Sequence, residues 1–218
     1  MFTKQPDTNR ATTMMGSQGK SRVRMRSPRG FLAAIVFLLA LPIAVLYQML
    51  FGNGAAAVLH LAFALGSVLL SLAVFDFQMP RWITWTGCVS AGALAAIFLL
   101  QGVADLIEND SLTYVANEVL GQWLERILVD LVILWFVAML LIDSQGKTRV
   151  LGFGAMSIAV CVEVYSYILM FFGTSLDAQV PTLKIMMLLP FVWLLLESIK
   201  KTHLTQDAVP SMGGPVKG

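Results

Sequence analysis

The chain contains six apolar stretches, each close to the ~20 residues that a helix needs to cross the hydrocarbon core of a bilayer. They cover residues 31–51, 55–75, 82–104, 114–142, 150–172 and 181–198. Because lipid cannot satisfy the hydrogen-bonding groups of an open backbone, all six stretches should be helices. The sequence therefore predicts an all-α, polytopic membrane protein with a six-helix transmembrane domain over residues 31–199.

The composition supports lipid as the main solvent of the chain. Charged residues make up 13% and hydrophobic residues 57% of the sequence, whereas about a quarter of a soluble domain is charged. The formal net charge of +2 averages a very basic amino terminus and a nearly neutral remainder. Nucleic-acid binding is a poor interpretation, because no folded domain would present the basic cluster.

The two ends of the chain are polar. Residues 1–30 are rich in Ser, Thr, Gly, Gln and basic residues, which predicts a disordered basic cytoplasmic tail, and residues 200–218 form a second tail. The first tail ends in a run of four arginines, Arg22, Arg24, Arg26 and Arg29. They could bind anionic lipid headgroups, or serve only as a topology signal. Stretch 31–51 is too long for the apolar core of a cleaved signal peptide, so we expect an uncleaved first span.

The distribution of basic residues predicts the orientation. Of the 15 Lys and Arg residues, only Arg126 and Lys184 lie outside the tails and alternate connections that would share one side. The opposite connections carry acidic residues, among them Asp105 and Asp177. Because basic loops remain in the cytoplasm, both termini should be cytoplasmic, and we expect a multi-pass protein of the bacterial cytoplasmic (inner) membrane. Short loops predict a compact antiparallel bundle.

Five ionisable residues inside the apolar stretches are the candidate site residues: His60, Arg126, Asp130, Glu163 and Lys184. Counting from the cytoplasmic ends of the predicted helices places them at about 18 to 24 Å, in the outer half of the core. Helical phase turns two faces toward the bundle interior. These faces are Glu118, Gln122, Glu125, Arg126 and Val129, and Gly152, Ala159, Glu163, Ser166 and Tyr167.

Two interpretations compete for this polar layer. Arg126 could pair with Asp130 at i,i+4, and Lys184 with Glu163 between helices, which would give a self-compensating core. Alternatively the layer lines a hydrated cavity, in which Asp130 or Glu163 binds a cation or proton and His60 titrates. The leading functional hypothesis is binding or transport of a small polar or cationic solute, or of a proton.

The alternative from another class is a structural or assembly subunit, whose polar faces meet a membrane-protein partner or a second copy. An enzyme is disfavoured, because HExxH, GxSxG, P-loop and GxGxxG motifs are absent. A lipid-modifying carboxylate pair of Asp130 and Glu163 remains a minor alternative. No metal site or cofactor is expected, since His60 lacks a second His or a Cys pair.

Three further expectations concern the last helix and the proline positions. Glu197 with Lys200 and Lys201, at i+3 and i+4, has the pattern of a solvated helix end. Pro42 and Pro190 fall inside apolar stretches and should bend their helices.

Overall fold

The computed structural model describes residues 24–51, 54–107, 110–172, 183–199 and 201–202. The chain divides into two compact units, and the described helices all belong to the unit Met25–Lys200. The chain ends form the other unit, and the two-residue strands are β1 (Arg24–Met25) and β2 (Lys201–Thr202). The description that follows concerns the helical unit.

The helical unit consists of long apolar helices and several short helical segments. In chain order these are α1 (Pro28–Phe51), α2 (Ala55–Ala73), the 3₁₀ turn η1 (Val74–Asp76), α3 (Arg81–Ile107), α4 (Asp110–Tyr114), the π-helix η2 (Val115–Glu125), α5 (Arg126–Ile142), α6 (Lys147–Phe171), α8 (Leu183–Met186) and α9 (Leu189–Ile199). The predicted helical class of the protein is confirmed.

Among the described residues, four helices are long and apolar enough to cross a membrane: Pro28–Phe51, Ala55–Asp76, Arg81–Ile107 and Lys147–Phe171. These four indicate a multi-pass membrane protein. The predicted fourth stretch is a continuous helical run through α4, η2 and α5, in which α5 has 17 residues. The predicted sixth stretch contains α9, whose 11 residues span about 16 Å, less than the hydrocarbon core.

The two prolines behave differently. Pro42 lies inside α1, which continues through it. Pro190 is the second residue of α9, and a turn separates α9 from α8. In this turn the Leu188 amide donates to the Ile185 carbonyl at 3.0 Å, and the Phe191 amide donates to the Leu188 carbonyl at 3.0 Å. Proline lacks an amide proton and fits the first turn of a helix, so the bend expected at Pro190 takes the form of a new helix start.

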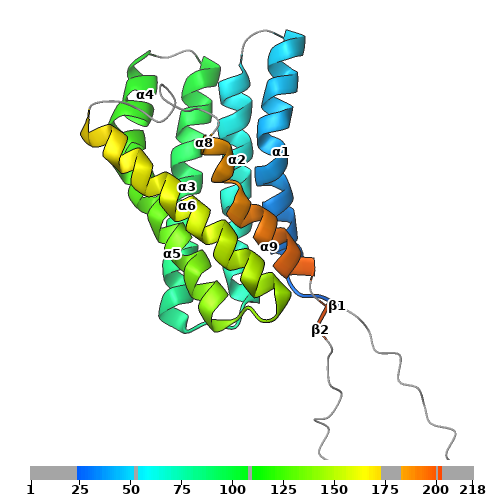
Figure 1. Ribbon diagram of the computed structural model, residues 1–218. Coiled ribbons are helices and arrows are strands. Elements are labelled where there is room, and N and C mark those ends of the chain that lie inside the picture. The colour runs from blue at the N-terminus through cyan, green and yellow to red at the C-terminus, as the bar shows by residue number, and fades with distance from the viewer. Residues whose placement is uncertain (1–23, 52–53, 108–109, 173–182, 200, 203–218) are drawn as a thin grey trace, which may run out of the picture. The chain divides into compact units, whose positions relative to one another are not determined.

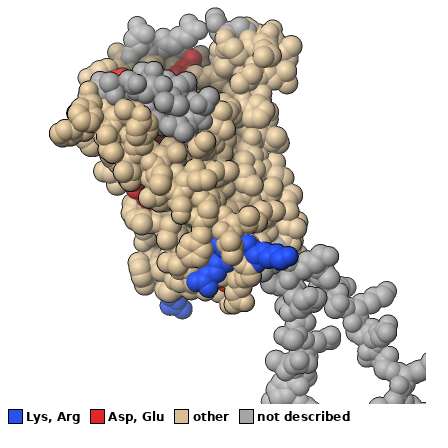
Figure 2. Space-filling model, viewed as in Figure 1, with Lys and Arg blue, Asp and Glu red and all other residues tan. Residues whose placement is uncertain are grey.

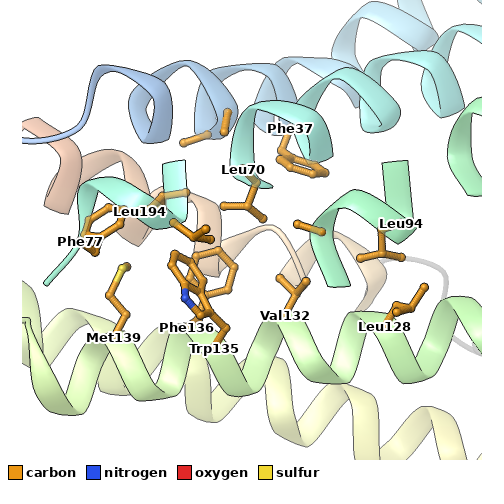
Figure 3. Packing of buried hydrophobic residues seen from close by; sticks show 14 of the residues in the cluster. Phe37, Leu70, Phe77, Leu94, Leu128, Val132, Trp135, Phe136, Met139 and Leu194 are labelled. Atoms are coloured by element: carbon orange, nitrogen blue, oxygen red, sulfur yellow. The ribbon is translucent and has the colours of Figure 1, made fainter. Parts of the chain in front are cut away.

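The long helices pack around a shared apolar core. α2 packs against both α1 and α3, α5 packs against α3, and α9 packs against α1 and α6 (Figure 1). Figure 3 shows side chains of this core, including Phe37, Leu70 and Phe136, pointing toward one another between the helices. Phe37 stacks on Phe191 with ring centroids 4.0 Å apart, which joins α1 to α9. The first helix of the unit in chain order, α1, is thereby packed against the last described helix, α9.

Glycine permits one of the closest helix contacts. A Cβ built on Gly87 of α3 would lie 2.4 Å from the Trp135 ring of α5. The indole therefore occupies the space that any larger residue at position 87 would need, and α3 and α5 approach closely because of it.

The outer surfaces of the long helices are apolar. On α1, Leu46, Met49 and Leu50 are more than half exposed, and on α6 the same holds for Val164 and Phe171. Water-soluble monomers rarely expose apolar patches of this extent. Contact with the hydrocarbon of a bilayer accounts for these surfaces.

Basic side chains gather at one end of the helical unit, the end at which α1, α3 and α6 begin (Figure 2). Arg29, Arg81, Lys147 and Arg149 are exposed there. Such an asymmetry of charge between the two ends is the feature that orients multi-pass proteins.

Candidate functional site

Polar contacts join α2 to α3 through the predicted site residue His60. Its Nδ1 atom lies 2.8 Å from Asp105 Oδ2 and is hydrogen-bonded to it, and the His60 ring stacks near Phe98. Asp105 was expected in an outer connection, but α3 continues to Ile107, so Asp105 belongs to the helix. The pair is partly buried, so this carboxylate and the imidazole compensate each other at the helix interface.

The next contact joins α3 to η2, one turn before Asp105. Gln101 is 4% exposed, and its Nε2 donates to Glu125 Oε2 at 2.9 Å and to the Ala116 carbonyl at 3.5 Å. Gln101 was not among the predicted site residues. The signal was available, since an uncharged amide in an apolar stretch must find partners inside the bundle.

Two predicted residues of α5 reach across to α6. Arg126 Nη1 donates to Ser166 Oγ at 2.9 Å, and its guanidinium lies 5.8 Å from the centre of the Tyr167 ring. The Tyr167 hydroxyl donates to Asp130 Oδ2 at 2.6 Å. The ion pair expected between Arg126 and Asp130 is therefore replaced, within the described contacts, by bonds to the hydroxyls of α6. A hydroxyl both donates and accepts, so serine can serve the cation and tyrosine the anion.

Glu163 lies one turn before Tyr167 on α6 and is partly buried. Asp130, Glu163 and Arg126 all lie within electrostatic range of the Tyr167 hydroxyl. The structure thus brings these predicted residues together in what we call the α5–α6 cluster, made of Arg126, Asp130, Glu163, Ser166 and Tyr167.

The remaining predicted residues lie elsewhere. His60 is on α2 and pairs with α3. Lys184 is in α8, but its side chain falls outside the described residues, so its pairing with Glu163 stays a prediction.

Of the two helix faces predicted to point into the bundle, the one on α6 is buried at several positions, and the one that begins on η2 includes an exposed residue. On α6, Gly152, Ala159 and Ser166 are buried, as the helical phase predicts. On η2, Glu118 is exposed, although it was expected to face the interior. The expectation assumed 100° per residue, and a π-helix with i→i+5 bonding departs from that spacing. The Gln122 side chain falls outside the described residues.

A second group of charges lies at the basic end of the unit. Arg26, just before α1, forms ion pairs with both Asp143 and Glu197. Ser144 Oγ donates to Glu197 Oε2 at 3.2 Å. We call Arg26, Asp143, Ser144 and Glu197 the basic-end cluster. It joins the start of α1, the α5–α6 connection and the end of α9.

The expectation that Glu197 is solvated is wrong, since its side chain is 0% exposed. The nearby lysines suggested a solvated end, but Glu197 lies at i+4 from the buried Trp193 and so shares its face. The periodicity of α9 would have placed this carboxylate inside.

The four amino-terminal arginines also differ from one another. Arg26 is held by carboxylates, whereas Arg29 is 54% exposed and lies 3.8 Å from Asp76. Arg22 and the side chain of Arg24 fall outside the described residues. Of these four arginines, Arg29 is thus the one whose described side chain is exposed.

The surface grooves of the unit are apolar. One of about 330 Å³ lies beside α6 and α8 and includes Ser157, Cys161 and Tyr165. Another of about 450 Å³ lies between α2 and α3 and includes Gly92 and Leu65. Neither groove is lined by a residue of the α5–α6 cluster. Across the described ranges, no group of three or more His, Cys, Asp or Glu side chains is placed to hold a metal ion.

No family model matches the chain, and no curated protein or solved structure matches it either. Its function has to be inferred from the geometry of its own residues.

Proposed function

We propose that the protein crosses the cytoplasmic membrane of a bacterium six times, with both termini in the cytoplasm. The gathering of exposed basic residues where α1, α3 and α6 begin supports this orientation. Successive long helices run in opposite directions, which favours an antiparallel bundle (Figure 1). The run through α4, η2 and α5 supplies a fifth span, and the segment containing α8 and α9 a sixth.

We further propose that the α5–α6 cluster binds a small polar or cationic solute, or a proton, and passes it across the membrane. The observation that supports this proposal is that Arg126 and Asp130 are each hydrogen-bonded to a hydroxyl of α6. A guanidinium has five donors and a carboxylate about four acceptor sites. Arg126 and Asp130 each make one hydrogen bond within the described contacts, so most of this capacity remains for a ligand.

The residues have distinct roles in this proposal. Asp130 and Glu163 accept the cation or proton, and the Tyr167 hydroxyl holds Asp130 in place. Arg126 and Lys184 tune the charge of the site, and His60 adds a titratable group on α2. Insertion of each such charge costs about 2.5 to 3.5 kcal/mol, a cost that a purely apolar helix would avoid.

The test is proton flux into proteoliposomes loaded with a pH-sensitive dye, under an imposed membrane potential. We expect D130N and E163Q to abolish the flux seen with the wild type. E118Q is the matched control, because it changes an exposed carboxylate of η2 and should leave the flux intact. Equal dye signals from wild type and D130N would contradict the proposal.

The second candidate is a structural or assembly subunit that meets a partner's helices or a second copy of the chain. The apolar character of both grooves and the mutual pairing in the basic-end cluster favour it. Under this candidate, D130N and E163Q would lower thermal stability or release a partner, and no flux would depend on them.

A further inference from the structure

The Gln101 side chain has a polar atom without a hydrogen-bond partner among the described residues. Its side chain is 4% exposed and its Nε2 makes hydrogen bonds to η2, but within the described residues Oε1 has no hydrogen-bond partner. Leaving a buried acceptor in this state is unfavourable, which is why most buried polar groups are paired. A hydrogen-bond donor or a cation at this position would remove the cost.

The surroundings of Gln101 consist of acceptors. Glu125 Oε2 lies 2.9 Å from its Nε2, and the Ala116 carbonyl oxygen lies 3.5 Å away. One turn along α3, Asp105 accepts from or donates to His60 according to the tautomer and protonation of the pair. Beside Gln101 the site therefore presents oxygen atoms and the carboxylate of Glu125, which a small cation would balance.

Gly121 packs closely against these groups. A Cβ on Gly121 would lie 3.1 Å from Gln101 Nε2, 3.3 Å from the Ala116 carbonyl oxygen and 3.4 Å from Glu125 Oε2. The three polar groups therefore converge on the one position of η2 that has no side chain. This position lies in a π-helix, a rare geometry that is frequently found at functional sites.

We propose that Gln101 Oε1 and the Glu125 carboxylate bind a monovalent cation between α3 and η2. Na⁺ would be coordinated by both oxygens. The site is separate from the α5–α6 cluster and does not depend on the function proposed for it.

The test is thermal unfolding of the detergent-purified full chain, followed by tryptophan fluorescence. NaCl replaces choline chloride at constant ionic strength and pH. Binding to the folded state predicts a saturable rise in the unfolding midpoint, roughly 3 to 6 °C at ten times Kd. We expect two variants to lose this rise. Q101L removes Oε1, and G121A places a methyl group against Gln101 and Glu125. Ala exceeds Gly in helix propensity, so G121A should remain folded.

D130N is the matched control, because it alters the α5–α6 cluster and should retain the Na⁺ response. Loss of flux in D130N with a retained midpoint shift separates failure of one proposal from failure of the other. E125Q, which removes the charge of the second proposed ligand, should also reduce the rise. A midpoint insensitive to Na⁺ overturns the proposal, as does a Na⁺ response retained in both Q101L and G121A.

Discussion

The basic-end cluster and the α5–α6 cluster both hold charges inside an apolar bundle, and they satisfy them in different ways. At the basic end, Arg26 contacts two carboxylates directly, and Glu197 has no exposed surface. Between α5 and α6, Arg126 and Asp130 are only partly buried, and each is bonded to a neutral hydroxyl. The basic-end cluster pairs its charges directly, whereas Arg126 and Asp130 use only part of their hydrogen-bonding capacity in the described contacts.

The difference indicates where a ligand could act. A direct ion pair that is fully desolvated loses a great deal when either partner is removed, so it fixes the position of the helix ends that it joins. A charge held by a hydroxyl can exchange that partner for water or a solute at small cost. This difference favours a structural role for the basic-end cluster, and it leaves the α5–α6 cluster as the proposed binding site.

The largest expected effect is from R26A. The substitution leaves Asp143 and the buried Glu197 without their shared cation, which should cost about 3 to 5 kcal/mol of unfolding free energy. Chemical unfolding in detergent measures the loss. R29A is the matched control at an exposed arginine of the same segment, and it should cost at most about 1 kcal/mol. Similar losses for R26A and R29A would remove the distinction between the clusters.

Neutralising one carboxylate in each cluster sharpens the comparison. E197Q removes one of the two anions that hold Arg26, and the loss of a charged hydrogen bond should cost about 1.5 to 3 kcal/mol. In D130N the amide oxygen can still accept from the Tyr167 hydroxyl, so the cost should stay below about 1 kcal/mol. Thermal midpoints of the two variants, compared in one detergent, check this order. If D130N is less stable than E197Q, the structural role belongs to the α5–α6 cluster and not to the basic-end cluster.

The sequence predicted more about the helices than about their partners. Apolar length identified the helical stretches, because it depends on each segment alone. The break before Pro190 changed a predicted single span into two short helices, and the π geometry of η2 turned Glu118 outward. Both departures depend on local backbone geometry that hydropathy does not encode.

The candidate residues could be placed along their helices, but not given partners, for the same reason. Depth along the helices placed Asp130, Glu163 and Arg126 at similar levels, and they do lie near one Tyr167 hydroxyl. Their hydrogen-bond partners could not be predicted, because a depth count contains no information about rotation between helices. The pairing of Arg26 with Glu197 joins residues at opposite ends of the chain, which no local pattern indicates.

The smallest expected effect comes from replacing one serine of each cluster by alanine, in S144A and S166A. Ser144 Oγ donates to Glu197, whose carboxylate has no exposed surface, so in S144A no water readily replaces the lost donor. We expect S144A to cost about 1 to 2 kcal/mol. Ser166 Oγ accepts from Arg126, whose partly buried guanidinium can turn to water or to a bound solute. S166A should therefore cost only about 0.5 kcal/mol.

The same pair of variants also separates packing from bonding. Ser144 and Ser166 are both buried, so replacing either hydroxyl by hydrogen removes a similar volume, and a packing effect alone would lower both unfolding midpoints equally. A difference between them reports on whether each ionic partner can find another hydrogen bond. If S166A proves as costly as S144A, Arg126 is as isolated from solvent as Glu197, and the α5–α6 cluster has no capacity left for a ligand.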